Sequence, residues 1–371
     1  MKRFLMKHRT CNMKTFGFAA APLLAAAALI CSCEKNDFTP PDWNYEIPQT
    51  SLKAQTQLGA FYTIQTAPDW KSAQEYTPVL CVESDEESGD VTIIPYNSTQ
   101  DGILTAQFEM AAKAGIDFFV IPWNNGTTEQ NFISAYDYYW NEDVHVKLAV
   151  NYNFSHLKIE ALSGEGSDFD KVVEDFTSLS ATLFDKDWYY KMPDGRAVII
   201  VSGMASETID YEQFIPAFRE AMKDISLEFY IIGENTTNWC PPQTNQSTAR
   251  HLDGNYVKKW VPANYYERWY CFYPFTDMAW ENWRNYAKEW NNDFVPCIFP
   301  EYFTSASSER SIDRSEENWT RFCNVAKRNL GSQSVILINS WNDFTYDTAL
   351  EPTLEYGETY LEITRRELKL P

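Results

Sequence analysis

Acidic side chains follow three apolar segments of this sequence, at the point where each segment ends. The segment 335–341, VILINSW, is apolar on both faces, and Asp343 and Asp347 come directly after it. Glu301 and Glu234 end two further apolar segments. A pair of carboxyl groups supplies the acid and the base, or the acid and the nucleophile, that cleavage of a glycosidic bond requires. Spacing along the chain does not give the separation of these groups in space, so it distinguishes neither retention nor inversion.

Three of these acidic residues also have a purely structural interpretation. An Asp at a strand end is a frequent N-cap of the next helix, which applies to Asp343. Glu301 follows a proline and is close in sequence to Arg310 and Arg314, either of which would form an ion pair with it. Glu234 follows a glycine, where a carboxylate often accepts hydrogen bonds from loop amides. A functional site is favoured over these structural interpretations because several expected strands end in an acidic residue.

Amide and aromatic side chains accompany the carboxylates at the strand ends. Asn and Asp side chains form paired hydrogen bonds to vicinal hydroxyl groups, while Trp and Tyr rings stack on the apolar faces of sugars. This set predicts a site for a neutral, polyhydroxylated ligand. The candidate binding residues are Tyr62, Trp123, Asn124, Asn151, Asn153, Glu234, Tyr273, Trp341, Asn342 and Glu351.

The segments that position these residues alternate between strand and helix. Helical patterns, with apolar residues three and four apart, cover 102–114, 169–184, 211–223, 278–290 and 316–330, and Asp277 and Ser315 are expected as N-caps. Eight strands alternating with helices predict an α/β protein with a single (β/α)8 barrel of the TIM type. An open doubly wound sheet is the alternative, but no glycine-rich phosphate loop follows a strand. The expected strands are 58–63, 116–123, 146–153, 197–204, 229–234, 269–273, 295–302 and 335–341.

The N-terminal region has the pattern of an export signal. A basic start is followed by an apolar run, 16–30, that is short for a membrane span. The sequence LICSC resembles the lipobox of bacterial lipoproteins, which implies cleavage before Cys33, acylation of that residue and attachment to a membrane outside the cytoplasm. We therefore expect a signal peptide over 1–32, a polar, proline-containing tether over 33–55 and the barrel over 56–371.

Charge and motifs exclude several classes of protein. The net charge of −21 and the pI near 4.6 argue against a nucleic acid or an anionic membrane surface as partner, because both require a basic patch. The cysteines beyond Cys33 lack CxxC spacing, so we expect buried thiols and no zinc site. No nucleophile elbow, HExxH or Walker pattern is present, and no cofactor is expected.

The C-terminal sequence INSWNDF, followed by LEP and YGETYLEITRREL, resembles the closing motif of glycoside hydrolase families 71 and 99, which include endo-α-1,2-mannosidases. The order of the segments AGIDFFVIPW, KLAVNYN and YCFYPFTDMAWENW is also similar, and the resemblance spans roughly residues 58–368. Only the closing motif is specific. The resemblance implies a barrel fold and action on glycans.

Residue by residue, the resemblance makes Asp343 the first family carboxylate, a Glu in the mannosidases that acts as base on the sugar 2-hydroxyl group and an Asp in family 71 glucanases. The second family carboxylate falls at Tyr346, with Asp347 one position later. A further family Glu aligns with Asn151. These departures leave two alternatives: Asp347 or Glu301 replaces the missing acid, or the chain binds glycans without cleaving them.

From the sequence we therefore expect a lipid-anchored glycoside hydrolase at the bacterial cell envelope. Its substrate would be an exogenous oligosaccharide or polysaccharide, with α-mannosyl and α-glucosyl linkages as candidates. In this hypothesis Asp343 is the base, Asp347 or Glu301 is the acid, and Trp123, Tyr273 and Trp341 stack on sugar. The alternative is a surface glycan-binding protein that retains the barrel and has lost the acid.

Overall fold

A computed structural model gives the fold of the chain. By their contacts the residues divide into two units, 1–42 and 43–371. The structure describes residues 46–66, 71–72, 76–84, 91–124, 126–155, 157, 168–203, 211–223, 228–234, 248–257, 272–302 and 312–371. The first unit, with the expected signal peptide and Cys33, therefore lies outside the described residues.

The main sheet is parallel throughout and has the order β10-β11-β1-β4-β5-β6-β7-β8-β9. Its strands are β1 (Gln57–Phe61), β4 (Phe118–Trp123), β5 (Lys147–Asn153), β6 (Ala197–Ser202), β7 (Phe229–Glu234), β8 (Gly254–Tyr256), β9 (Asp293–Phe294), β10 (Cys297–Ile298) and β11 (Val335–Ile338). A separate antiparallel hairpin, β2 (Val82–Ser84) and β3 (Val91–Ile93), follows β1.

The sheet closes on itself because its two edge strands are parts of one segment. β9 pairs with β8 and β10 pairs with β11, and only Val295 and Pro296 separate β9 from β10. The Val295 amide donates to the Asn255 carbonyl group at 2.8 Å, while the Leu337 amide donates to the Pro296 carbonyl group at 2.9 Å. Segment 293–298 is thus bonded on both sides and completes a ring of eight strands, as the sequence predicts.

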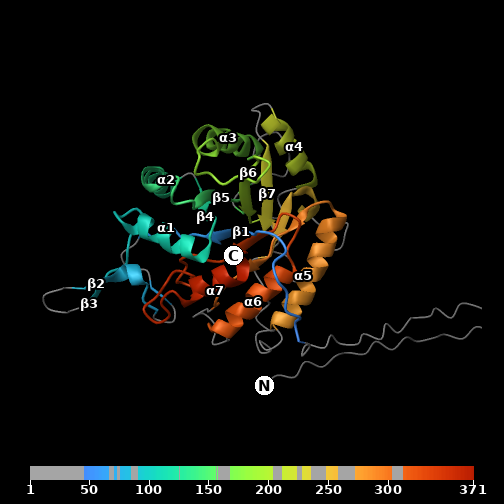
Figure 1. Ribbon diagram of the computed structural model, residues 1–371. Coiled ribbons are helices and arrows are strands. Elements are labelled where there is room, and N and C mark those ends of the chain that lie inside the picture. The colour runs from blue at the N-terminus through green and yellow to red at the C-terminus, as the bar shows by residue number, and fades with distance from the viewer. Residues whose placement is uncertain are drawn as a thin grey trace, which may run out of the picture. The chain divides into compact units, whose positions relative to one another are not determined.

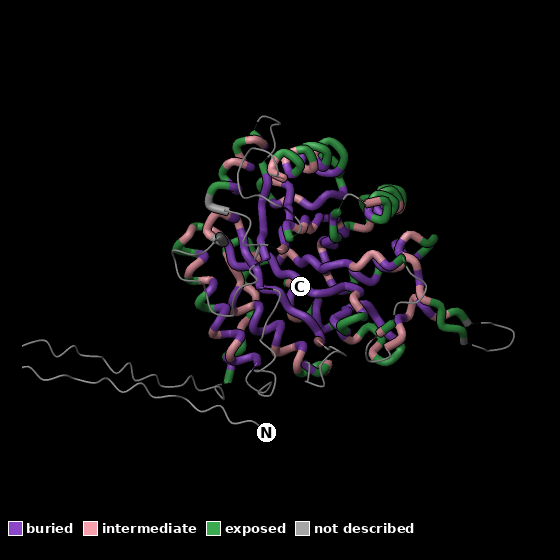
Figure 2. The backbone as a smooth tube through the Cα atoms, turned by 180° about the vertical axis from the view of Figure 1, so that it is seen from behind, coloured by how far each residue is buried: buried purple, intermediate pink, exposed green. Residues whose placement is uncertain are grey.

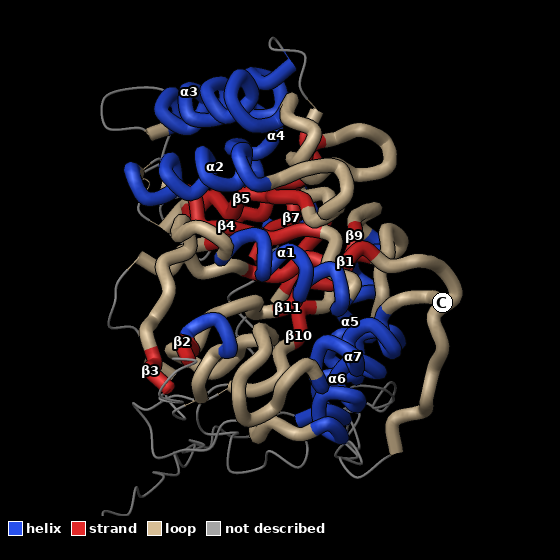
Figure 3. Tube along the Cα trace, turned by 60° about the vertical axis from the view of Figure 1, so that its left-hand side comes forward, coloured by secondary structure: helices blue, strands red, loops and turns tan. Residues whose placement is uncertain are grey.

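Helices cover the outside of this barrel (Figures 1 and 3). Most strands are followed by a helix before the next strand begins, as in a chain of βα units. Between β7 and β8 the described residues contain only the 3-10 helix Thr248–His251, in agreement with the absence of helical periodicity there. The α-helices are α1 (Ile103–Ala114), α2 (Thr127–Tyr139), α3 (Phe169–Leu179), α4 (Tyr211–Lys223), α5 (Phe272–Glu289), α6 (Glu316–Arg328) and α7 (Thr359–Leu368).

Two apolar clusters occupy the two faces of the sheet, and alternation along each strand assigns residues to them. In β6, Val198 and Ile200 belong to the smaller cluster, which contains strand residues from around the ring and fills the barrel. Ile199 and Val201 belong to the larger cluster, which contains the helices. Figure 2 shows the buried strands at the centre and exposed residues on the outer helix faces. This alternation decides which strand-end side chains face the barrel mouth.

Of the region 269–273, expected as a strand, the structure describes only Phe272 and Tyr273, and these two residues are helical. Tyr273 lies in the first turn of α5, and the sixth strand of the ring is Gly254–Tyr256. Pro274 fits the first turn of a helix because amide groups there have no intrahelical acceptor. A helix starting at Phe272 also places Asp277 inside α5, where it accepts from Arg328 at 3.0 Å, so Asp277 is not an N-cap.

Ser315 caps α6 as expected, since its hydroxyl group accepts from the Asn318 amide at 3.1 Å. The end of the segment expected as a tether is docked on the same helix. Ile47 is buried, and the Thr50 amide donates to Asn324 Oδ1 at 3.0 Å. The domain therefore begins before residue 56. In the described part of the chain, the helices are too short or too polar to span a bilayer.

Candidate functional site

Closure of the barrel brings the predicted strand-end residues to one end of the molecule. Glu234 ends β7, Glu301 follows β10 and Asp343 follows β11. In a parallel barrel these carboxyl ends form a single rim, which is where such folds carry their sites. The three carboxylates thus belong to the same end of the barrel, although they are separated by up to 109 residues in sequence.

Asp343 is the half-buried carboxylate of the predicted catalytic set. Its amide group donates to Ser340 Oγ at 2.7 Å, and its Oδ1 accepts from the Thr345 amide at 3.0 Å. These bonds fix the loop after β11 and orient the carboxylate. Asp343 therefore combines a defined conformation with partial access to solvent, as a group that reacts with a ligand requires.

Glu301 is buried in an ion pair. Its Oε2 lies 3.0 Å from Arg314 Nε, and the two side chains are 5% and 2% exposed. The Tyr76 hydroxyl group donates to Oε1 at 3.4 Å. Of the two arginines close in sequence, Arg314 is the partner that the structure reveals, while Arg310 lies outside the described residues.

Arg314 also connects Glu301 to the loop that carries Asp347. Its Nη2 donates to the backbone carbonyl groups of Asp347 at 3.1 Å and Ala349 at 2.6 Å. The rings of three tyrosines surround its guanidinium group, with centroids 4.9 to 5.5 Å away. Such contacts stabilise a desolvated cation. The tyrosines of this cage are Tyr76, Tyr356 and Tyr360.

Asp347 is fully buried beside this cluster. Its Oδ1 accepts from the Ser72 hydroxyl group at 2.6 Å, and its φ of 52° lies in the left-handed region, which Asp tolerates better than most residues. Burial raises the pKa of Glu301, the Arg314 charge lowers it, and the Asp347 charge raises it further, with a net increase above the ordinary value. A raised pKa favours a carboxyl group as proton donor.

Tyr302 and Tyr346 form an aromatic pair near Asp343, and the sequence did not predict this pair. The rings of Tyr302 and Tyr346 stack with an interplanar angle of 8° and a centroid distance of 6.0 Å. Tyr346 is 46% exposed. Burial raises the pKa of Tyr302, with smaller contributions from the neighbouring Tyr346 and Asp343. The position where the resembling families have Glu thus carries an exposed ring.

Glu351 belongs to a buried hydrogen-bond network on the helix side of the sheet, with Tyr62 and with Gln107 of α1. Its carboxylate accepts from the Tyr96 hydroxyl group at 2.6 Å and from Gln107 Nε2 at 3.3 Å. Gln107 Oε1 in turn accepts from the Tyr62 hydroxyl group at 2.7 Å. Burial raises the pKa of Glu351 to about 7, although Tyr96 and Gln107 lower it. Glu351 is 1% exposed, so its partners are protein groups rather than solvent.

Strand parity explains the position of the predicted aromatic residues. Tyr62, Trp123 and Trp341 all belong to the cluster between sheet and helices, with 2%, 7% and 0% exposure. The Trp341 ring lies 5.4 Å from that of Phe119, and Tyr62 packs between Phe119 and Phe132. These rings are core side chains that face the helices, so they do not line the barrel mouth in this structure.

Three further predicted binding residues have structural partners. Tyr273 is 4% exposed, and its ring lies under the Arg321 guanidinium group at 4.8 Å. Asn342 is fully buried and bonds both the amide and the carbonyl group of Thr63, at 2.8 and 3.0 Å. Asn124 is exposed, and its Nδ2 lies 3.4 Å from Glu129 Oε1.

The predicted residues that do face the barrel interior are Asn151, Asn153 and Glu234. They continue the inward alternation of Ala149 in β5 and Ile232 in β7. Asn151 and Asn153 are half-buried, and Glu234 is 9% exposed.

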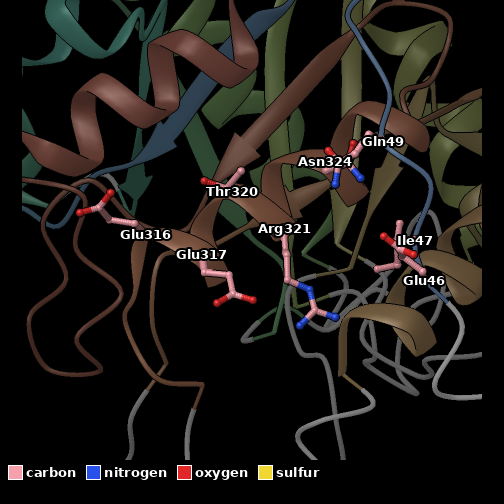
Figure 4. Close-up of a pocket in the computed structure, with 8 residues that line it drawn as sticks. All are labelled: Glu46, Ile47, Gln49, Glu316, Glu317, Thr320, Arg321 and Asn324. Atoms are coloured by element: carbon pink, nitrogen blue, oxygen red, sulfur yellow. The ribbon is translucent and has the colours of Figure 1, made fainter.

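Two cavities lie away from this rim. One, of about 730 Å³, opens at the amino-terminal ends of the strands, near Tyr230 and Asp293. The other, of about 460 Å³, lies between residues 46–49 and the start of α6, and Figure 4 shows Glu317 and Arg321 on its helix side. Within the described ranges, His, Cys, Asp and Glu form no group of three that could hold a metal ion.

No family model matches the sequence, and no curated protein matches it. Solved structures do match the fold. A glycoside hydrolase-like protein has a TM-score of 0.75 at 20% identity, over 88% of this chain and 98% of its own. The family 99 endo-α-mannosidase from Bacteroides thetaiotaomicron has a TM-score of 0.59 at 14% identity, over 84% and 96%. An endo-β-1,4-glucanase from Xanthomonas axonopodis has a TM-score of 0.50 at 9% identity, over 84% and 99%. The chain thus has the barrel fold of structures that include a glycoside hydrolase-like protein and family 99 endo-α-mannosidases.

Proposed function

We propose that this chain is a glycoside hydrolase that acts on an oligosaccharide or polysaccharide. The observation that carries the proposal is the convergence of Glu234, Glu301 and Asp343 on the carboxyl-end rim of a closed parallel barrel. Similarity of fold to a family 99 endo-α-mannosidase supports the choice of reaction. Fold alone does not define a reaction, so the argument depends on the carboxylates.

We assign the role of base to Asp343 and that of acid to Glu301 or Asp347. Of Asp343, Glu301 and Asp347, it is Asp343 that is partly accessible to solvent. A proton donor must hold its proton near neutral pH, and the raised pKa of Glu301 favours it for that role. The ion pair with Arg314 opposes protonation, which keeps Asp347 as the alternative acid.

The second candidate function is glycan binding without cleavage. It is favoured by Tyr346, which occupies the position of the second carboxylate in the resembling families, is exposed and stacks on the half-buried Tyr302. An exposed aromatic ring suits contact with the apolar face of a sugar ring. It does not supply the carboxyl group that the family pattern has at this position.

A screen of glycans separates the two functions. Purified protein would be incubated with α-mannans, α-glucans and N-glycans, and released reducing ends would be measured beside binding by calorimetry. A hydrolase produces new reducing ends, and Asp343→Asn removes them while binding persists. Binding by the wild-type chain with no product from any glycan would favour the second function.

We further propose that the protein is exported and anchored through a lipid on Cys33. The support is the apolar run followed by LICSC in the sequence. Metabolic labelling with a fatty acid should mark the wild-type chain and not Cys33→Ala, and the labelled protein should fractionate with membranes. Equal labelling of both chains would contradict the anchor.

A further inference from the structure

A row of polar side chains crosses four neighbouring strands inside the barrel mouth. Asn153 of β5 pairs in register with Ser202 of β6. One residue before, Val201 pairs with Gly233, so Ser202 is level with Glu234. Glu234 pairs in register with Tyr256. We call these residues the β5–β8 row: Asn153, Ser202, Glu234 and Tyr256.

All members of the β5–β8 row face the barrel interior. Asn153, Ser202 and Glu234 each lie two or four positions after an inward residue of the same strand, namely Ala149, Ile200 or Ile232, and Tyr256 itself belongs to the inner cluster. Counted around the ring, β6 is four strands from β11 in both directions. The β5–β8 row therefore includes the strand opposite β11 and extends to β8, which is two strands from β11.

Two polar atoms on this wall are buried without a hydrogen bond to any of the described residues. The Tyr256 hydroxyl group is one, in a side chain that is 0% exposed, and the neighbouring inward residue Asn151 contributes its Oδ1. Leaving a buried polar group unbonded costs about 1–3 kcal/mol, so such atoms need an explanation. A bound ligand explains them if its hydroxyl groups supply the missing hydrogen-bond partners.

The Asn153 side chain is also held in an orientation that suits a hydrogen bond to a ligand. Its Oδ1 accepts from the Ser155 amide at 2.9 Å, which fixes the side chain and leaves the amide nitrogen as a donor. Gly203, with φ of 72°, permits this approach, because a Cβ there would collide with Asn153 Oδ1 and lie 2.5 Å from the Ser155 nitrogen. The backbone thus preorganises one donor at the edge of the row.

The chemistry of the row fits a sugar hydroxyl group. A carboxylate such as Glu234 only accepts hydrogen bonds, whereas the Tyr256 hydroxyl group donates one. A ligand hydroxyl group between them donates to the first and accepts from the second. The charge of Glu234, after burial, contributes to the raised pKa of Tyr256, which keeps that hydroxyl group protonated as a donor.

We propose that the β5–β8 row is a sugar-binding subsite on the wall of the barrel mouth, in which Glu234 and Tyr256 recognise hydroxyl groups and take no part in bond cleavage. Ser202 and Tyr256 are the residues that sequence reasoning missed. This inference rests on the proposed function, because it requires that the chain binds glycans.

The test compares Tyr256→Phe with Tyr230→Phe by calorimetry on manno- and gluco-oligosaccharides. Both tyrosines point into the barrel from adjacent strands, but Tyr230 lies at the amino end of β7. Tyr256→Phe removes a hydroxyl group that has no partner among the described residues, so its Tm should equal or exceed that of the wild type. Its Kd should rise about tenfold, the effect of one lost hydrogen bond to the ligand. Tyr230→Phe should leave Kd unchanged.

Glu234→Gln supplies the second arm. It should raise Kd or KM about tenfold and change kcat by less than that, in contrast to Asp343→Asn. Normal binding by both Tyr256→Phe and Glu234→Gln would overturn the subsite and leave the proposed function intact. Loss of kcat at unchanged Kd in Glu234→Gln would also overturn it, since Glu234 would then be catalytic. If the wild type neither binds nor cleaves any of these glycans, the proposed function fails and the subsite with it.

Discussion

Arg314 Nε lies 3.0 Å from Glu301 Oε2 inside a cage of tyrosine rings, with both side chains almost completely buried. The pair joins the segment after β10 to the loop after β11, because the same guanidinium group bonds the carbonyl groups of Asp347 and Ala349. Two candidate acids are thus held by one cation. Arg314 therefore fixes the positions of the two rim segments that carry Glu301 and Asp347.

Replacing Arg314 by Met should destabilise the fold by about 3–5 kcal/mol, because it leaves the Glu301 charge buried without its cation. Urea denaturation measures this loss. The double variant Arg314→Met, Glu301→Gln should recover part of it, since the buried charge is then absent. Lys113→Met, which removes the exposed partner of Glu358, is the control and should change stability by less than about 1 kcal/mol. An equally small effect at Arg314 would contradict the buried pair.

Glu351 predicts a pH-dependent stability. Its pKa of about 7 in the folded protein exceeds its ordinary value of 4.5, so the folded state holds the proton more tightly. Stability from this group is complete below pH 4.5 and is lost as the pH rises through 7. The free energy of unfolding of Glu351→Gln, relative to that of the wild type, should therefore increase by about 3 kcal/mol as the pH rises from 4.5. Above the folded-state pKa of about 7 the rise should continue only until the wild-type carboxyl group is fully ionised, and the difference should then stay constant. Chemical denaturation at several pH values measures the difference, and a constant difference would refute the raised pKa.

Tyr346→Ala should weaken glycan binding by about tenfold with little change in Tm, because its ring is exposed and is stacked on Tyr302 alone among the described rings. Tyr138→Ala is the matched control, since that ring is also exposed and paired but lies on α2. Titration of oligosaccharides by calorimetry gives both affinities. Equal affinities would exclude the Tyr302–Tyr346 pair from the site.

The sequence predicted the barrel because its central strands are continuous apolar runs, which only a sheet covered on both faces explains. β8 escaped prediction because its three residues, Gly254–Tyr256, have no apolar periodicity and are ordered by pairing with β7 and β9. The aromatic run at 269–273 was expected as a strand, but its two described residues, Phe272 and Tyr273, form the start of α5. Short strands defined by their neighbours carry little local signal.

The candidate site was only partly accessible to sequence reasoning. The carboxylates could be found because they interrupt apolar runs, but the face on which a strand-end side chain lies depends on parity. A one-residue difference sends Phe61 into the barrel and Tyr62 towards the helices. The pairing of Glu301 with Arg314 was one of two sequence alternatives, and only tertiary structure selects it. Tyr256 could not have been found in this way, because β8 has only three residues and is recognised only by its pairing with β7 and β9.

The most direct test of the glycosidase proposal is single-turnover kinetics of the wild type and Asp343→Asn on whichever α-mannan, α-glucan or N-glycan the screen identifies, with binding measured on the same samples. Thr345→Ala is the matched control and should retain the wild-type rate, because Thr345 bonds the Asp343 carboxylate through its backbone amide, which the substitution preserves. The account predicts that Asp343→Asn loses about 10²–10⁴-fold in the cleavage rate at unchanged affinity, since a positioned acid or base contributes that much. Cleavage by Asp343→Asn at the wild-type rate would contradict the central claim.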